Sequence, residues 1–169
     1  MSKYRQRPCP LSPLVFDDPE AIEEFATIIY DLHEAIAKKG ACYEVSLSEA
    51  LREITLGRIK GALASVFCSY FGHTPHDRFS DIFDQLSGLA EHLAKDHVFE
   101  DGNKRTSLLL VFIILGTRHI KVVFDDSPDP KRNPYYQWIQ DLVSGARSRD
   151  ELADDLRSNA VIVEPDSDE

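Results

Sequence analysis

The sequence predicts an all-α protein that consists of a single compact helical domain. Apolar residues recur at three- and four-residue spacing in several segments, and residues that cap helices precede most of these segments. The chain has 169 residues, 43% of them hydrophobic, which suits one domain with a sizeable core, and no repeat or linker divides it. We therefore expect an extended leader over residues 1–16, the helical domain over 17–158 and a disordered acidic tail over 159–169.

The first helix is expected to begin at Asp18-Pro19, because Asp18 can cap it and proline suits its first position. Asp17 and Glu20 have the spacing of a capping box, and Gly40 is a natural stop. Between these ends the apolar residues are spaced so that they form one stripe along the helix: Ile22, Phe25, Ile29, Leu32 and Ile36.

A second helix is expected to start at Ser46, with Glu49 at capping-box spacing. Gly57, Gly61 and Ser65 lie four residues apart and so share one face of this helix. Three small residues on one face predict close packing against another helix. The alternative is that Gly57 divides the segment into two helices.

Further helices are expected over residues 80–96, around the apolar run 108–115, from Asn133 and from Ser148. The run 108–115 has no polar face, so we interpret it as the central helix, covered by neighbours on every side. Residues 120–124 have the composition of a short strand or an extended segment.

The acidic composition narrows the classes of partner. The chain carries 19 Lys and Arg against 29 Asp and Glu, and this net charge of −10 argues against nucleic acid and anionic membranes as partners. Cys9, Cys42 and Cys68 form no CxxC pair, so neither a zinc cage nor a disulfide framework is expected. No apolar run approaches the roughly 20 residues of a membrane span, and the N-terminus has no apolar signal core. We expect a cytoplasmic protein.

The most informative stretch is residues 97–106, HVFEDGNKRT, a polar loop that leads from one apolar helix into the next. Unpaired N–H groups at a helix start attract anions, and Gly102 lets a ligand approach the backbone closely. Asn103 offers an amide donor, while Lys104 and Arg105 supply positive charge for phosphate oxygens.

Two further residues of this loop complete a set with catalytic chemistry. His97 can serve as a neutral base near neutral pH, and Asp101 offers the hard carboxylate oxygen that Mg²⁺ prefers. Each residue alone is typical of a solvated loop whose charges pair with one another. A base, a metal carboxylate and a phosphate cradle within ten residues instead favour phosphoryl or nucleotidyl transfer.

This stretch resembles the signature of the Fic superfamily, H-P-F-x-D/E-G-N-G-R-x-x-R, and most closely that of its death-on-curing (Doc) branch, H-x-F-x-D-A/G-N-K-R. The positions that match the Doc pattern are His97, Phe99, Asp101, Gly102, Asn103, Lys104 and Arg105. The segment 29–34, IYDLHE, is also similar to an early helix of Doc-like proteins. The resemblance covers roughly residues 20–158.

The resemblance implies a helical Fic/Doc-like domain that uses ATP as substrate together with Mg²⁺. His97 would be the general base that deprotonates a target hydroxyl, and Asn103 and Arg105 would act beside it in catalysis. Residues Gly102 to Arg105 would bind the phosphates, and Asp101 would hold the metal.

Two positions bear on which group is transferred. Lys104 stands where AMP-transferring members have Gly, and Leu108 stands where they have a second Arg. Both departures follow the Doc pattern and favour transfer of a phosphoryl group to a Ser, Thr or Tyr hydroxyl of a target protein, as in a toxin that acts on a translation factor. Transfer of AMP or another NMP is the alternative within the same fold. A non-catalytic nucleotide-binding helical module is the alternative from a different class.

The resemblance also implies two partners. The turn-rich break after the second helix lies where the family carries a small β-hairpin flap that pairs with the target, the alternative being an ordinary loop. The residues of this candidate flap are Gly72, His73, Thr74, Pro75, His76, Asp77 and Arg78. Self-inhibited Fic proteins carry a Glu followed by Gly or Asn, and no Glu of this chain is followed by either. We therefore expect a separate antitoxin or inhibitory protein.

Overall fold

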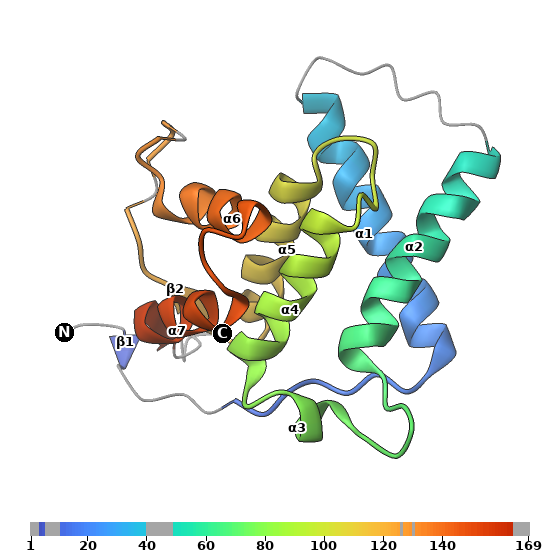
Figure 1. Ribbon diagram of the computed structural model, residues 1–169, viewed down its shortest axis with the longest axis horizontal. Coiled ribbons are helices and arrows are strands. Elements are labelled where there is room, and N and C mark those ends of the chain that lie inside the picture. The colour runs from blue at the N-terminus through green and yellow to red at the C-terminus, as the bar shows by residue number, and fades with distance from the viewer. Residues whose placement is uncertain (1–3, 6–10, 40–48, 126, 130, 164–169) are drawn as a thin grey trace, which may run out of the picture.

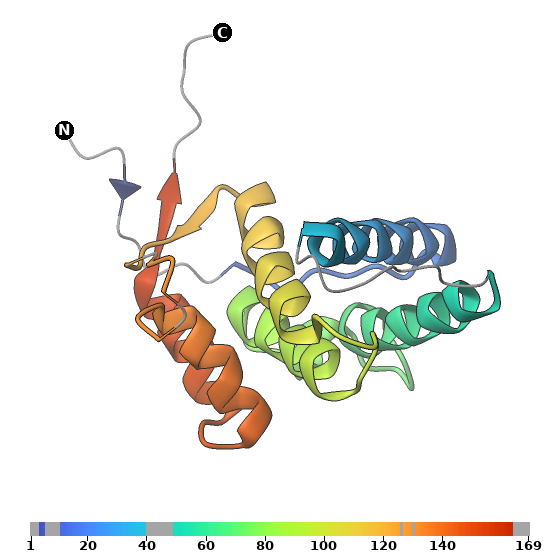
Figure 2. The same cartoon turned by 90° about the horizontal axis from the view of Figure 1, so that it is seen from above.

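The computed structural model describes residues 4–5, 11–39, 49–125, 127–129 and 131–163. Within these residues the chain is largely helical, as expected, and a small antiparallel sheet lies at one side (Figures 1 and 2). The helices are α1 (Pro19–Lys39), α2 (Glu49–Phe67), α3 (Pro75–Arg78), α4 (Ile82–Lys95), α5 (Asn103–Thr117), α6 (Pro134–Ser144) and α7 (Arg149–Asn159). The strands are β1 (Tyr4–Arg5), β2 (Ile120–Val122) and β3 (Ala160–Val163).

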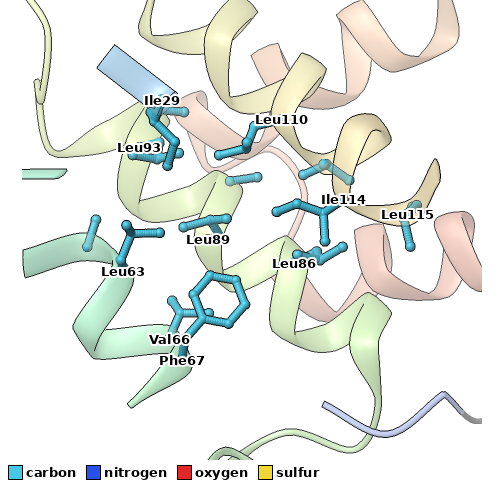
Figure 3. Close-up of a cluster of buried hydrophobic side chains, with 14 of the residues drawn as sticks. Ile29, Leu63, Val66, Phe67, Leu86, Leu89, Leu93, Leu110, Ile114 and Leu115 are labelled. Atoms are coloured by element: carbon cyan, nitrogen blue, oxygen red, sulfur yellow. The ribbon is translucent and has the colours of Figure 1, made fainter. Parts of the chain in front are cut away.

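Helix α4 is the central helix of the domain, and it packs against α2, α5, α6 and α7. Its Leu86, Leu89 and Leu93 are fully buried and lie among side chains from the surrounding helices (Figure 3). Ser87, Gly88 and the alanines of α4 are buried as well, because small side chains let the neighbouring helices approach closely.

The prediction that the run 108–115 is the covered central helix is therefore wrong in its placement. This run lies in α5, whose Leu109 and Ile113 remain 38% and 43% exposed. A run without a polar residue carries no periodicity that could separate a covered face from an open one.

The caps expected from the sequence are present at three helices. The Asp18 carboxylate accepts from the Glu20 N–H at the start of α1, and the Asn133 side chain accepts from two backbone N–H groups at the start of α6. Ser148 and Glu151 form a capping box at α7. Asp17 differs from the prediction: its carboxylate accepts from the backbone N–H and hydroxyl of Ser69, so it ties the leader to the end of α2.

The small-residue face of α2 does not pack against another helix as expected. Helix α2 runs unbroken through Gly57, and a methyl group added at Gly57 or Gly61 would meet no other atom within 4 Å. Ser46 and the predicted stop Gly40 lie outside the described residues. Gly61 instead lines an open hollow of about 290 Å³ between α2 and α4, bordered at one end by Arg58 and Val98.

Both ends of the chain contribute strands to the sheet, whose order is β1-β3-β2 with antiparallel pairing. Residues 120–122 form β2, which confirms the short strand expected there. Residues 160–163, expected within a disordered tail, form the central strand β3, so that part of the tail prediction is wrong. Tertiary pairing with β2 orders a segment whose own sequence carries no helix or turn signal. Residues 164–169 lie outside the described residues.

The described part of the leader is also fixed to the core. Gln85, fully buried in α4, exchanges hydrogen bonds with the backbone N–H and carbonyl of Leu14, both at 2.7 Å. Its amide also donates to the carbonyl of Val66 in α2. Residues 11–16 therefore pass across the start of α4 without regular secondary structure, and backbone hydrogen bonds at Leu11, Leu14 and Phe16 hold them there. No described helix has the length and apolar content that a membrane span requires.

Candidate active site

The loop between α4 and α5 carries the residues that the sequence singled out. Val98 and Phe99 are 2% and 3% exposed, so they anchor the loop in the core. His97, Glu100 and Asp101 are exposed around these anchors. The two buried side chains thus fix the loop, which is neither strand nor helix, and the polar residues on either side of them stay at the surface.

His97 occupies a left-handed backbone conformation, with φ at 48°. A residue with a Cβ is rarely found there, so its surroundings must stabilise the conformation. The guanidinium of Arg58, on α2, donates to the His97 carbonyl oxygen at 3.2 Å. The position of the candidate base therefore depends on a helix that lies about forty residues earlier in the chain.

Asn103 closes the loop through a reciprocal pair of hydrogen bonds. Its side-chain oxygen accepts from the Phe99 N–H at 2.8 Å, and its side-chain nitrogen donates to the Phe99 carbonyl at 2.8 Å. Both ends of the amide are thus used within the loop. In this structure Asn103 shapes the loop with its side-chain oxygen and one N–H of its amide, and its role as a phosphate donor stays a prediction.

The start of α5 lacks the features that usually stabilise a helix N-terminus. Its N-cap residue, Gly102, has no side chain to accept a hydrogen bond, and its first turn contains no acidic residue. The first bond of the helix joins the Thr106 N–H to the Gly102 carbonyl at 2.9 Å. Within the described residues, the backbone N–H groups of Asn103, Lys104 and Arg105 have no acceptor. Three open donors at one helix end are the arrangement that binds anions.

Gly102 has a φ of 77°, a left-handed conformation that suits glycine. A Cβ there would come within 3.2 Å of Cε1 of His33. Gly102 is therefore favoured for two reasons: its backbone is left-handed, and the His33 ring of α1 lies where a side chain would begin.

The two cations of the site differ in their contacts. The Lys104 ammonium donates to the side-chain oxygen of Gln140 on α6 and is half-buried. Arg105 is exposed and has no hydrogen bond or ion pair with any residue that the structure describes. Cations at a helix N-terminus are unfavourable for the helix dipole, and a bound anion would compensate for them.

Asp101 is exposed, and its Oδ1 accepts from the Gly102 N–H at 2.6 Å. No group of three potential metal ligands occurs among the described residues, so the protein alone does not form a closed metal cage. This donor set fits Mg²⁺, which commonly uses one or two carboxylates and takes its remaining ligands from phosphates and water.

His33 on α1 lies against the loop, although no motif in the sequence indicated a role for this residue. Its ring stacks on the Phe99 ring, with centroids 3.7 Å apart and planes 12° apart, and its Nδ1 lies 3.1 Å from the Thr106 hydroxyl. Burial lowers the pKa of His33, an effect that the charges of Asp101 and Glu34 oppose. The ring is therefore neutral at neutral pH.

The candidate flap lies far from this loop. Gly72 belongs to a tight turn that a single antiparallel bridge closes between Tyr70 and His73, and α3 follows directly. The hairpin is thus reduced to one bridge. This segment precedes the first turn of α4, whereas the loop follows the last turn, and Figure 1 shows the two at opposite ends of that helix. A helix of 14 residues is roughly 20 Å long, so these residues do not border the candidate base.

Residues far apart in the sequence complete the site: His33, Arg58 and Gln140, from α1, α2 and α6. The sequence signal for His33 was its place in the segment 29–34, which resembles an early helix of Doc-like proteins. Arg58 and Gln140 carry no such signal, because an isolated polar residue on a helix is usually solvated.

Comparison with known proteins agrees with this geometry. A model of the Fic/DOC family matches residues 17–115, which is more than half of the chain and includes the whole loop. No curated protein matches the chain. The match ends within α5, so α6, α7 and the paired strands β2 and β3 lie outside it.

Proposed function

Because the chain belongs to the Fic/DOC family, whose members are generally transferases of nucleotide-derived groups, we propose that it transfers a phosphoryl group from Mg-ATP to a hydroxyl of a target protein. The start of α5 is the observation that carries this proposal. It combines three open N–H groups, an unpaired cation at Arg105 and a preceding loop that presents His97.

The reaction assigns one proton transfer to the protein. His97 takes the proton of a Ser, Thr or Tyr hydroxyl, and the hydroxyl oxygen forms a bond to the γ-phosphorus of ATP. The bond from that phosphorus to the β–γ bridging oxygen breaks, and ADP leaves with the electron pair. The protonated His97 then returns its proton to solvent. The products are a phosphorylated side chain and ADP.

The other residues of the loop hold the substrate for this step. The N–H groups of residues 103–105 and the Arg105 guanidinium bind phosphate oxygens. Asp101 is the residue that would hold Mg²⁺, which when bound neutralises part of the polyphosphate charge. Asn103 acts through Phe99, by keeping the loop closed so that the candidate base stays near the start of α5.

Leu108 and Lys104 support phosphoryl over AMP transfer. Leu108 is half-buried and packs against the core, so the second turn of α5 offers no cation there to grip a terminal phosphate. Lys104 extends towards α6, where its ammonium donates to the side-chain oxygen of Gln140. Both features match the Doc pattern and are consistent with a γ-phosphate that lies next to the hydroxyl that His97 deprotonates.

Two labelled nucleotides test the proposal. The purified protein is incubated with a cell lysate, Mg²⁺ and ATP labelled at either the α or the γ phosphorus. We expect label from the γ position alone to enter a protein. Label from the α position would mean nucleotidyl transfer. Label from neither would leave a nucleotide-binding module, which a calorimetric titration with ATP would then detect.

Two histidine variants make this test specific. His97→Ala is expected to reduce transfer by about 10²- to 10⁴-fold, whereas His92→Ala removes an exposed ring that pairs with Asp96 and is expected to leave transfer unchanged. Equal transfer by wild type and His97→Ala would remove the base assignment.

We further propose that a separate protein inhibits the enzyme, because the self-inhibitory Glu pattern is missing from the sequence. The isolated chain is then expected to be active without truncation. Activity that emerged only after removal of an end segment would show that the chain inhibits itself.

A further inference from the structure

The loop and the start of α5 must keep a fixed mutual orientation if His97 is to meet a phosphate that α5 holds. Three residues span this junction: Phe99 in the loop, Gly102 at the cap and Thr106 in the first turn of the helix. Side-chain bonds within the segment connect Asn103 back to Phe99. Arg58 of α2 bonds to the loop alone, at His97, and Gln140 of α6 bonds to the helix alone, at Lys104. The His33 imidazole of α1 contacts both the loop and the helix.

We propose that His33 is a positioning residue for transfer, which fixes the His97 loop relative to the phosphate-binding end of α5. The inference rests on the proposed function. The imidazole contacts the junction at all three residues: it stacks on Phe99 at 3.7 Å, lies 3.1 Å from the Thr106 hydroxyl and fills the space beside Gly102.

The contacts require both the shape and the polarity of histidine. The stack on Phe99 needs a flat ring, because the two ring planes lie only 12° from parallel with their centroids 3.7 Å apart. Thr106 is fully buried, and a buried hydroxyl without a partner is costly, so the ring nitrogen satisfies a group that the helix encloses. A phenyl ring could supply the first contact and an amide the second, but neither supplies both.

His33 would affect catalysis through the position of the His97 loop and not through contact with substrate. Gly102 has no Cβ, so the imidazole edge approaches the backbone at the cap of α5. If the ring were removed, the loop could rotate about this cap while α5 kept its own backbone geometry. The phosphate cradle, which belongs to α5, would then change less than the position of His97 relative to it.

Three substitutions separate these contributions in the full-length protein. His33→Ala removes both contacts, His33→Phe keeps the stack, and His33→Asn keeps a polar group near Thr106. We expect kcat for transfer to fall by about tenfold to hundredfold in His33→Ala, and less in the other two, because a displacement of about 1 Å can cost that much. The KM for ATP is expected to change much less than kcat.

His92→Ala serves as the matched control, since this histidine lies in α4 near the same loop but pairs with Asp96 instead. A purely structural role for His33 would lower the melting temperature and leave kcat per folded molecule unchanged well below that temperature. A folded His33→Ala protein with wild-type kcat would therefore overturn the proposal.

A second measurement does not depend on transfer. Gly102→Ala places a Cβ 3.2 Å from the His33 ring. The double variant His33→Ala/Gly102→Ala is therefore expected to lose less stability than the two single variants lose in sum, because the contact is absent from it. Additive losses in thermal unfolding would show that the ring does not press on the cap. If wild type transfers no label but this coupling is present, the proposed function fails while the placement of His33 stands.

Discussion

The starts of α5 and α7 are built from opposite principles. At α7, Ser148 accepts from the Glu151 N–H, the Glu151 carboxylate accepts from the Ser148 N–H at 2.7 Å, and the first turn contains the acidic residues Asp150 and Glu151. At α5 the cap is Gly102, and the first turn holds two cations and no acid.

The start of α7 is arranged to stabilise its helix, whereas the start of α5 is arranged as an anion site would be. The capping box satisfies the Glu151 N–H of α7 internally, and the acidic residues of the first turn of α7 disfavour an anion there. The start of α5 lacks that stabilisation, and its unpaired N–H groups and positive potential are what the proposed phosphate site requires. Where a local sequence contradicts the rules for a stable helix, a functional reason is the first to consider.

The largest effect that tests the comparison is loss of transfer in His97→Ala. We expect transfer to fall by about 10²- to 10⁴-fold, because general base catalysis usually contributes that much. The helix content and melting temperature should stay near those of wild type, since the imidazole is exposed. Rates of γ-label transfer and circular dichroism measure the two quantities. A fall of less than twofold would contradict the assignment of His97.

A matched pair of glycines tests the special demand at the cap of α5. Gly102 and Gly145 both have a φ of 77°, but a Cβ at Gly145 would meet no other atom within 4 Å. Alanine at either position is expected to cost about 1–2 kcal/mol of unfolding free energy, because both are left-handed. Only Gly102→Ala should also lower kcat, through its contact with His33. Equal kcat in the two variants would show that the contact between position 102 and His33 has no effect on transfer.

Ser148→Ala tests the opposite end of the comparison. Loss of the cap at α7 is expected to lower the unfolding free energy by about 1 kcal/mol, and to leave transfer unchanged. Thermal unfolding should show a fall of roughly 2–4 °C for a chain of this size. A loss of transfer without a fall in stability would mean that α7 belongs to the site.

The smallest effect expected is a pH dependence of protein stability that comes from Glu151 at the start of α7. The hydrogen bonds from the backbone and hydroxyl of Ser148 lower the pKa of Glu151 below 4.5, its ordinary value. The folded state therefore binds this proton more weakly than the unfolded state, so the contribution to stability is present above pH 4.5 and is lost as pH falls through the folded pKa. Glu151→Gln should reduce the change in melting temperature between pH 6 and pH 3. An unchanged difference would show that the box contributes no such dependence.

Sequence reasoning succeeded where the determining contacts are local. The caps at Asp18, Asn133 and Ser148 involve residues two or three positions apart, so the spacing alone specifies them. It failed for Asp17, whose carboxylate meets Ser69 across 52 positions, and for the run 108–115, whose open face depends on where other helices lie.

The sequence by itself determined the helical class, most helix starts and which loop, residues 97–105, carries the candidate site, because each depends on neighbours within about one helical turn. The tertiary structure alone decided that α4 is central, that residues 160–163 pair as a strand, and that the candidate flap lies at the far end of α4 from His97. It also brought His33, Arg58 and Gln140 to the loop. The physical reason is that packing joins residues by distance in space, and a helical pattern constrains only which face is buried and not what buries it.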